Sequence, residues 1–295
     1  MSIVTKAMLV SIHVGMWTGQ RLDKRASAKV VRDANAADDA ARVNKHLVPK
    51  AALAPIVEAA GKLRKHFYAT TLPWRDNGDR LLPRAAYHMF VEGYAPLKDE
   101  FEAAVDHFLT VAYPTERDRA EFRMGDMFDP GDYPSALALA HRFYTRVEVN
   151  AVPDAGDFRV ELDADESRRI RDEIADNVNT RLRSAVTDLW DRLYDTLEAF
   201  AERMASDTKF YDTTVSNLQA LARAVPALNV TDDPDLARLA DRLADRAALW
   251  DPKEIRADRN ARDAAAEEAR EVLDEMSDFM VKFRAVNGEN SGDEA

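Results

Sequence analysis

The sequence predicts a mainly α-helical α+β protein with a small antiparallel β-sheet and long helices that pack in the manner of a coiled coil. Three observations lead to this fold class. The 295 residues include only 10 glycines and 12 prolines, so regular elements are interrupted rarely. Apolar residues recur every three or four positions along most of the chain, which is the spacing of a helix face. Only three short segments alternate apolar and polar residues, as half-buried strands do.

The three alternating segments are Leu9–Trp17, Phe143–Asn150 and Phe158–Leu162. Every second side chain in them is apolar, so one face of an extended strand would be buried. The second and third segments are joined by a loop with Pro153 and Gly156, which predicts an antiparallel hairpin with a wide loop. Because an isolated hairpin is marginal in water, we expect the first segment to pair with it.

Helices are predicted in the first half over Lys50–Ala69 and Leu97–Tyr113, where apolar residues have helical spacing. Between them, Thr71–Tyr87 is rich in proline, glycine and aspartate, which favours a structured loop. A second loop is predicted over Gly125–Pro134, before the hairpin.

The longest predicted helix runs from Asp165 to about Ser206. Asp163 is its expected N-cap, and Glu166 would complete a capping box. Apolar side chains form one narrow stripe along it, and such a stripe needs a helical partner, either within the chain or in a second copy. The residues predicted to face this partner are Ile170, Ile174, Leu182, Val186, Leu193 and Leu197.

Two further helices are expected after Asp233–Pro234 and Asp251–Pro252, because each pair places a capping carboxylate before a proline at the first helical position. The second of these helices should end at Asn287–Gly288. Residues 288–295 form a polar acidic tail that is expected to be disordered. The chain therefore divides near residue 163 into a mixed α+β part, 1–162, and an all-helical part, 163–287.

The net charge of −12 is unevenly distributed. Residues 1–90 contain 15 Lys/Arg and 7 Asp/Glu, a net charge of +8. Residues 91–295 contain 26 Lys/Arg and 46 Asp/Glu, a net charge of −20. This asymmetry points either to an anionic partner for the first part or to contact between the two parts.

Two features bear on the compartment. The chain has no cysteine, which excludes disulfides, thiolate metal sites and a cysteine nucleophile. The apolar stretch near the N-terminus is broken by Ser11, His13 and Gly15, and it is too short for a membrane span and too irregular for a signal peptide. We expect a cytoplasmic protein without membrane contact.

No motif for catalysis or for a cofactor stands out. The six histidines are scattered and form no HExxH pair, and Walker A, GxGxxG and GxSxG patterns are all missing from the sequence. The acidic turn 76–79 and the series Asp126, Asp129 and Asp132 are interpreted as turn formers rather than cation ligands. We expect no catalytic residue, metal or cofactor, although a carboxylate-based active site would leave no fixed spacing and stays an alternative.

Basic and aromatic residues recur together within the first ninety positions. Lysine and arginine neutralise phosphates, and exposed aromatic rings stack on bases, so this set is a candidate nucleic-acid surface. Alternatively, its tryptophans lie in the core and its arginines pair with acids of the second half. No recognised nucleic-acid-binding motif decides between the two interpretations. The set comprises Trp17, Arg21, Lys24, Arg25, Lys62, Arg64, Lys65, Trp74, Arg75, Arg80 and Arg84.

The chain resembles a family of uncharacterised phage and prophage proteins in four segments, AMLVSIHVGMWTGQRLDK (7–24), TLPWRDNGDRLLPRAAY (71–87), DFRVEL (157–162) and ALNVTDDPDL (227–236). The resemblance spans most of the chain, but its motifs carry no assigned chemistry. Members of that family tend to be encoded near a MoxR-type AAA ATPase and a von Willebrand A-domain protein. The resemblance therefore implies an accessory role beside an ATP-driven machine.

These observations favour a non-enzymatic, phage-encoded accessory or adaptor protein. It would act through protein–protein contacts, with an AAA ATPase or a second copy of the chain as partner. The alternative is a protein of phage DNA metabolism that binds single- or double-stranded DNA through the basic residues of 1–90.

Overall fold

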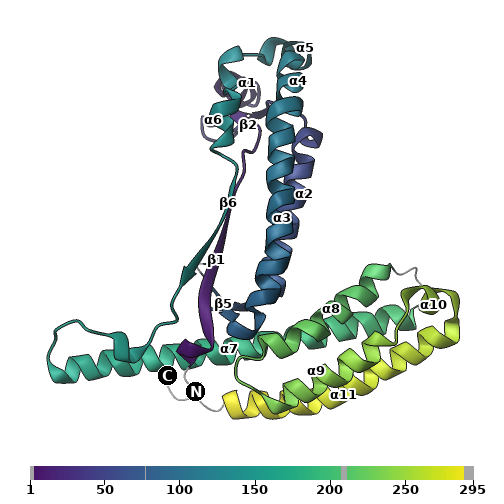
Figure 1. Ribbon diagram of the computed structural model, residues 1–295. Coiled ribbons are helices and arrows are strands. Elements are labelled where there is room, and N and C mark those ends of the chain that lie inside the picture. The colour runs from purple at the N-terminus through teal and green to yellow at the C-terminus, as the bar shows by residue number, and fades with distance from the viewer. Residues whose placement is uncertain (1–2, 77, 207–210, 289–295) are drawn as a thin grey trace. The chain divides into compact units, whose positions relative to one another are not determined.

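The computed structural model describes residues 3–76, 78–206 and 211–288 (Figure 1). The chain is 69% helical and has a small four-stranded antiparallel sheet and a two-stranded sheet, so the predicted fold class is confirmed. By their contacts, the residues divide into two compact units. Unit 1 comprises Met1–Ser11, Tyr68–Phe90 and Val149–Ala295, and unit 2 comprises Ile12–Phe67 and Val91–Glu148. This division is discontinuous along the chain and differs from the expected boundary near residue 163.

The four-stranded sheet has the strand order β4-β5-β1-β6. Strand β1 (Ala7–Gly15) pairs antiparallel with β5 (Arg80–Pro83), and β5 pairs antiparallel with β4 (Leu72–Pro73). Strand β6 (Tyr144–Asn150) lies beside β1 at the end of the order. The segment Thr71–Tyr87, expected to be a loop, thus supplies two strands. Leu81 and Leu82 of β5 are buried and pair with residues of β1, and β4 pairs with β5.

The predicted hairpin is wrong. Phe158–Leu162 forms no strand, and β6 is a neighbour of β1 instead. Alternation alone misleads here because the apolar side chains of the segment are not buried: Val160 is 61% exposed and Leu162 is 47% exposed. A short 3₁₀ turn, η6 (Ala155–Asp157), precedes this segment.

Two long helices, α2 (Lys50–Ala69) and α3 (Tyr87–His107), run side by side in unit 2 (Figure 1). The bounds of α2 are those predicted, whereas α3 begins earlier than expected and includes a glycine and a proline. Gly93 is needed there, since a Cβ at this position would lie 2.2 Å from the imidazole Cε1 of His66 on α2. The helix continues as a π-helical turn, η3 (Phe108–Ala112), and then as α4 (Tyr113–Asp118).

The smaller elements of unit 2 are only partly predicted. Strand β2 (Gln20–Leu22) pairs antiparallel with β3 (Asn44–His46), and between them lies α1 (Lys24–Asp33). Their sequences are too short for a periodic signal. The remaining elements are α5 (Ala120–Met124), the 3₁₀ turns η4 (Gly125–Met127) and η5 (Pro130–Asp132) in the predicted loop, and α6 (Ala136–Ala140).

The core of unit 2 is aromatic. The ring of Trp17 lies 6.2 Å from that of Phe108 and 5.7 Å from that of Tyr113, centroid to centroid. Phe143 closes the cluster, with its ring centroid 5.7 Å from that of Phe108. Side chains of α2, from Leu53 to Leu63, complete this core.

Unit 1 is dominated by helices: α7 (Ala164–Ala205), α8 (Asp212–Leu228), α9 (Pro234–Ala248), α10 (Pro252–Ala257) and α11 (Arg259–Gly288). The predicted caps are confirmed, because Asp163, Asp233 and Asp251 each accept a hydrogen bond from a backbone N–H of the first turn. The last predicted helix is divided at Asp258, whose extended backbone ends α10 and whose carboxylate accepts a hydrogen bond from Asn260 N. The tail predicted to be disordered lies outside the described residues, apart from Gly288, which ends α11.

Helices α8 and α11 pack against α7, and α9 packs against α8 (Figure 1). The ring of Trp250 stacks on that of Phe200, with centroids 4.6 Å apart. Two 3₁₀ turns, η1 (Ile3–Thr5) and η2 (Arg84–Ala86), complete the unit. None of the helices in the described part of the chain is both long enough and apolar enough to cross a membrane.

Candidate interaction surfaces

The predicted partner face of α7 divides into two parts. Leu193 and Leu197 are fully buried and Val186 is nearly so, in the part of α7 that packs on other helices of unit 1. For these residues the partner lies within the chain. Nearer the N-terminus of α7, Ile170, Ile174 and Leu182 are only half-buried, and no side chain before Ala185 is buried.

The first part of α7 is in contact with the segment 155–162 that precedes it. The turn η6 packs on α7, and Arg171 Nη2 donates to the carbonyl of Phe158 at 3.3 Å. Two exposed residues follow in that segment, Val160 and Leu162. We refer to Val160, Leu162, Ile170, Ile174 and Leu182 together as the α7 N-terminal surface.

The two tryptophans of the candidate nucleic-acid set lie in the interior. Trp17 and Trp74 are each 5% exposed, and Trp17 belongs to the aromatic core of unit 2. The carbonyl of Trp74 accepts a hydrogen bond from Arg181 Nη1 at 2.7 Å. Neither ring therefore offers an open face on which a base could stack.

Several cations of the same set already have partners. Lys62 Nζ lies 2.7 Å from Glu100 and 3.2 Å from Glu58, and the hydrogen bonds to these carboxylates raise its pKa. Arg64 Nη2 lies 3.5 Å from the carbonyl of Val14, and Arg75 lies 3.6 Å from the carboxylate of Asp79.

Arg80 is held inside unit 1. Its Nε donates to the hydroxyl of Thr71 at 2.7 Å, and its guanidinium lies 4.9 Å from the ring centroid of Tyr68. Burial, and next to it the charge of Arg192, lower the pKa of Arg80 to about 10. Arg192 also donates to the carbonyls of Tyr68 and Thr71 at 3.0 Å. The guanidinium groups of Arg80 and Arg192 therefore both contact the segment that joins α2 to β4.

The exposed cations that remain lie on three different elements. Lys24 and Arg25 are on α1, Lys65 is on α2 and Arg84 is in η2, and none of them forms an ion pair with a described residue. Helix α1 also exposes Lys29 and Arg32, which are not part of the predicted set. Among the described elements, α1 therefore carries the densest group of unpaired cations.

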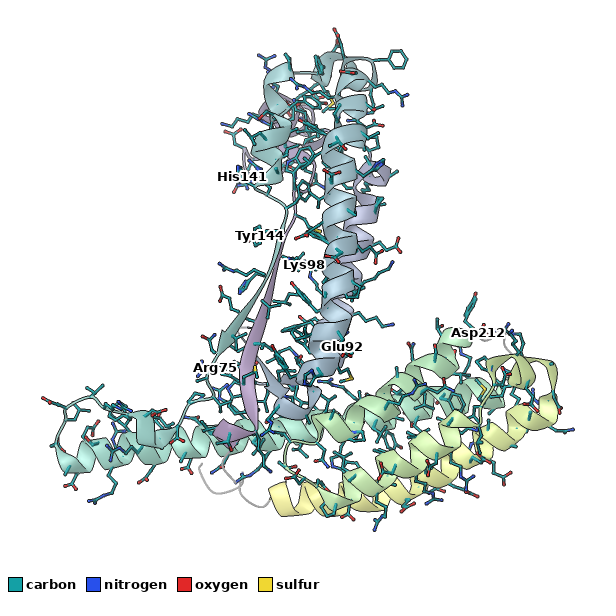
Figure 2. All side chains as sticks on the ribbon, viewed as in Figure 1. Arg75, Glu92, Lys98, His141, Tyr144 and Asp212 are labelled. Carbon is teal, nitrogen blue, oxygen red and sulfur yellow. The ribbon has the colours of Figure 1, made fainter. Side chains whose placement is uncertain are left out.

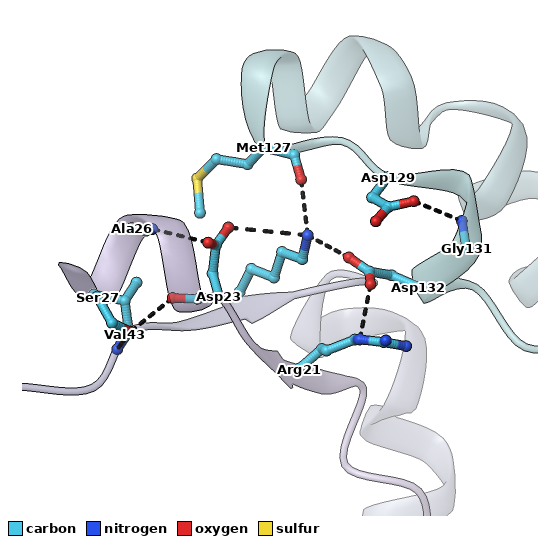
Figure 3. A network of polar contacts seen from close by, with 10 residues as sticks. Arg21, Asp23, Ala26, Ser27, Val43, Met127, Asp129, Gly131 and Asp132 are labelled. Carbon is cyan, nitrogen blue, oxygen red and sulfur yellow. Dashed lines mark hydrogen bonds and ion pairs between the residues drawn. The ribbon is translucent and has the colours of Figure 1, made fainter. Parts of the chain in front are cut away.

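A buried ion-pair network in unit 2, which the sequence did not reveal, centres on Lys45 of β3 (Figure 3). The side chains of Lys45 and Asp132 are 8% and 6% exposed and are in direct contact. Lys45 Nζ also lies 3.9 Å from a carboxylate oxygen of Asp23 and donates to the carbonyl of Met127 at 3.0 Å. Arg21, from the candidate set, binds the other oxygen of Asp132 at 2.8 Å.

The network connects three segments of unit 2 that are distant in sequence. Asp23 caps α1 by accepting from Ala26 N at 2.9 Å, and Asp132 ends η5, so Lys45 joins β3, α1 and the 125–134 loop. A buried and a part-buried carboxylate near one another could also signal a carboxylate-based active site. Here the ammonium group of Lys45 lies between them. Within the described residues, no group of three or more His, Asp or Glu side chains is placed to hold a metal ion.

No protein-family model, curated protein or solved structure matches the chain. The resemblance to the phage family therefore stays a prediction that rests on the four segments themselves.

Proposed function

We propose that this chain is a non-enzymatic, phage-encoded accessory or adaptor protein that works through protein–protein contacts made by the α7 N-terminal surface. The observation that carries the proposal is that no side chain of α7 before Ala185 is buried. Helices are stabilised mainly by packing of their apolar face, and an unpacked helix is marginal in water. The turn η6 contacts part of this stretch, and Ile174 lines a pocket with Trp74 and Pro153 of the same unit. The apolar surface that these contacts leave half-exposed is where a further partner would pack.

A second copy of the chain is the partner that the pattern favours. In an antiparallel pair of α7 helices centred on Ile174, residues equally distant from Ile174 face each other. Ile170 then meets Val178 of the other copy, and Asp165 meets Arg183. The three central residues are then apolar and the outer pair has opposite charge, an arrangement that specifies helix pairing, whereas Leu182 meets Glu166 in this register.

The test is the mass of the full chain in solution, measured by light scattering over a range of concentrations. We expect a dimer for the wild type, a monomer for Ile170→Asp/Ile174→Asp, and a dimer for the control Ala175→Asp/Asn179→Asp, which places the same two charges on exposed positions of the same helix. Circular dichroism confirms that each variant folds. A wild type that stays monomeric refutes the pairing.

An AAA ATPase partner is the other outcome that the resemblance suggests. If the wild type is monomeric and a MoxR-type ATPase binds it, with binding lost in the same double variant, the adaptor function holds with a different partner. If neither association occurs, the proposal fails.

A second candidate function, DNA binding, is favoured by one observation, the four exposed cations of α1. Lys24, Arg25, Lys29 and Arg32 are all exposed on one short helix. Fluorescence anisotropy with labelled single- and double-stranded DNA at low and near-physiological salt tests it. Binding through α1 would weaken steeply with salt, and the salt slope would fall by about one for each cation changed to alanine. No binding at low salt would exclude this function.

A further inference from the structure

Strand β6 has a neighbouring strand on one side only. It closes the order β4-β5-β1-β6, so within the described residues its outer edge carries no strand. The backbone N–H and C=O groups of such an edge can pair with an extended segment of another chain. Arg146 and Glu148, which form an ion pair with each other, are the charged residues of this strand.

A groove of 230 Å³ in unit 2 joins the start of β6 to α3 and η3. Apolar residues of α3, of η3 and of the start of β6 line it, together with the acidic residues Glu102 and Asp106 of α3. Phe101 and Phe143 are the buried members, at 1% and 8% exposure. The complete lining is Phe101, Glu102, Val105, Asp106, Leu109, Phe143, Tyr144 and Thr145. A groove between an edge strand and a helix is the setting in which peptides bind by strand addition.

The π-helical turn η3 shapes the helical side of this groove. In a π turn the hydrogen bond spans five residues, so Phe108 and Tyr113 come to the same side, with ring centroids 5.7 Å apart in the core. Leu109 is left in the lining of the groove. Such turns cost regular hydrogen-bond geometry and recur at functional sites.

The strand side of the groove is held in place by two contacts within unit 2. The hydroxyl of Tyr94 on α3 and that of Thr145 on β6 are hydrogen-bonded at 2.9 Å. The ring of Tyr144, labelled in Figure 2, lies over Gly15 of β1, where any Cβ would approach it to 2.2 Å. The side chain of Tyr144 is nevertheless 52% exposed, so it is available to a ligand.

The rim of the groove is acidic. Glu102 and Asp106 are one helical turn apart, and both are exposed. Lys98, labelled in Figure 2, pairs with Glu102 at 3.4 Å, whereas Asp106 forms no ion pair with a described residue. The local field at this rim therefore attracts a cation.

We propose that an extended segment of a partner protein adds as a strand to the outer edge of β6. One apolar side chain of the segment packs against Val105 and Leu109, the half-buried apolar members of the lining, and a lysine or arginine of the segment binds Asp106. This inference goes beyond the proposed function because it uses unit 2, and it holds or fails independently of pairing through α7.

The test uses the full chain and an array of labelled heptapeptides in which valine, leucine or phenylalanine alternates with threonine, lysine or glutamate. We expect the tightest peptides to contain lysine rather than glutamate. The best peptide is then N-methylated at either of its two alternate sets of residues. Only one set points its N–H groups at β6, so one form should lose about tenfold in affinity for each hydrogen bond removed and the other should bind like the parent.

Protein variants locate the site. Asp106→Lys should weaken the lysine-containing peptide at least about tenfold, because an attraction becomes a repulsion. Asp99→Lys is the matched control: it makes the same charge change at an exposed position of α3 outside the groove and should leave affinity unchanged. Three results would overturn the inference: no peptide of the array binds, both N-methylated forms bind like the parent, or the two aspartate variants behave alike.

Discussion

The sharpest structural prediction concerns Lys45, and the substitution is Lys45→Met. Methionine keeps the length of the side chain but removes the charge that lies between Asp23 and Asp132. Asp132 is 6% exposed, so its carboxylate would stay buried with only Arg21 beside it. Breaking a buried ion pair from one side costs about 3–5 kcal/mol, most of it the desolvation of the charge left behind.

Lys62→Met is the matched control for this prediction. It makes the same substitution at a lysine that also contacts two carboxylates, but the side chain of Lys62 is 43% exposed. Water solvates Glu58 and Glu100 when the lysine is removed, so we expect a much smaller loss than at Lys45. The contrast isolates burial, because the number of carboxylate partners is the same.

The assay has to report unit 2 separately. Trp17 is the only tryptophan of unit 2, whereas Trp74, Trp190 and Trp250 belong to unit 1. Urea titration of fluorotryptophan-labelled protein, followed by ¹⁹F NMR, therefore gives one resonance for unit 2. The double variant Lys45→Met/Asp132→Leu should recover part of the loss, with a coupling of about 0.5–3 kcal/mol. If Lys45→Met costs no more than Lys62→Met, the reasoning about the buried network is refuted.

Three further predictions follow from the packing. Gly93→Ala should destabilise unit 2 by about 1–3 kcal/mol through the contact with His66; in a His66→Ala background it should instead stabilise by about 0.5–1 kcal/mol, as measured by urea unfolding. Burial raises the pKa of Tyr113 and of Tyr133. The stability that the neutral hydroxyls contribute is therefore complete below the ordinary tyrosine pKa of about 10, and it is lost as pH rises through the raised pKa values. Near-ultraviolet titration should show both ionising late, and Tyr113→Phe or Tyr133→Phe should each remove one late step. Trp250→Ala should cost about 3–5 kcal/mol in thermal or urea unfolding, because the ring is buried on Phe200; a loss below 1 kcal/mol would contradict that packing.

Local signals in the sequence were sufficient for the capped helices. Asp163, Asp233 and Asp251 each precede a helix start, and a cap is read from residues that are neighbours in the chain. Pairing in the sheet is different, because Phe143–Asn150 alternates in the same way whether it pairs with β1 or with 158–162. The choice depends on which apolar faces become buried, and that is settled by contacts distant in sequence.

The candidate sites were predictable only where the signal was local. The long stripe of α7 was visible from its spacing, but the sequence could not show that its C-terminal part packs within the chain while Ile170 and Ile174 stay half-buried. The network of Lys45 joins residues 23, 45 and 132, and nothing near any one of them marks the others. The groove beside β6 depends on a π turn, and single residues do not encode such a turn.

The charge asymmetry of the sequence shows why net charge identifies no partner here. The first ninety residues carry a charge of +8, yet Lys45, Lys62 and Arg80 are held by groups within their own unit. In unit 1 the contacts between distant segments use arginines of the acidic half: Arg181 and Arg192 on α7 donate to backbone carbonyls of residues 68–74. Carbonyl acceptors have no formal charge, so a count of Lys, Arg, Asp and Glu cannot reveal these bonds. What a partner meets is the charges without an ion-pair partner, and among these the cations of α1 and the acidic rim at Asp106 are two surfaces of opposite sign within the same unit.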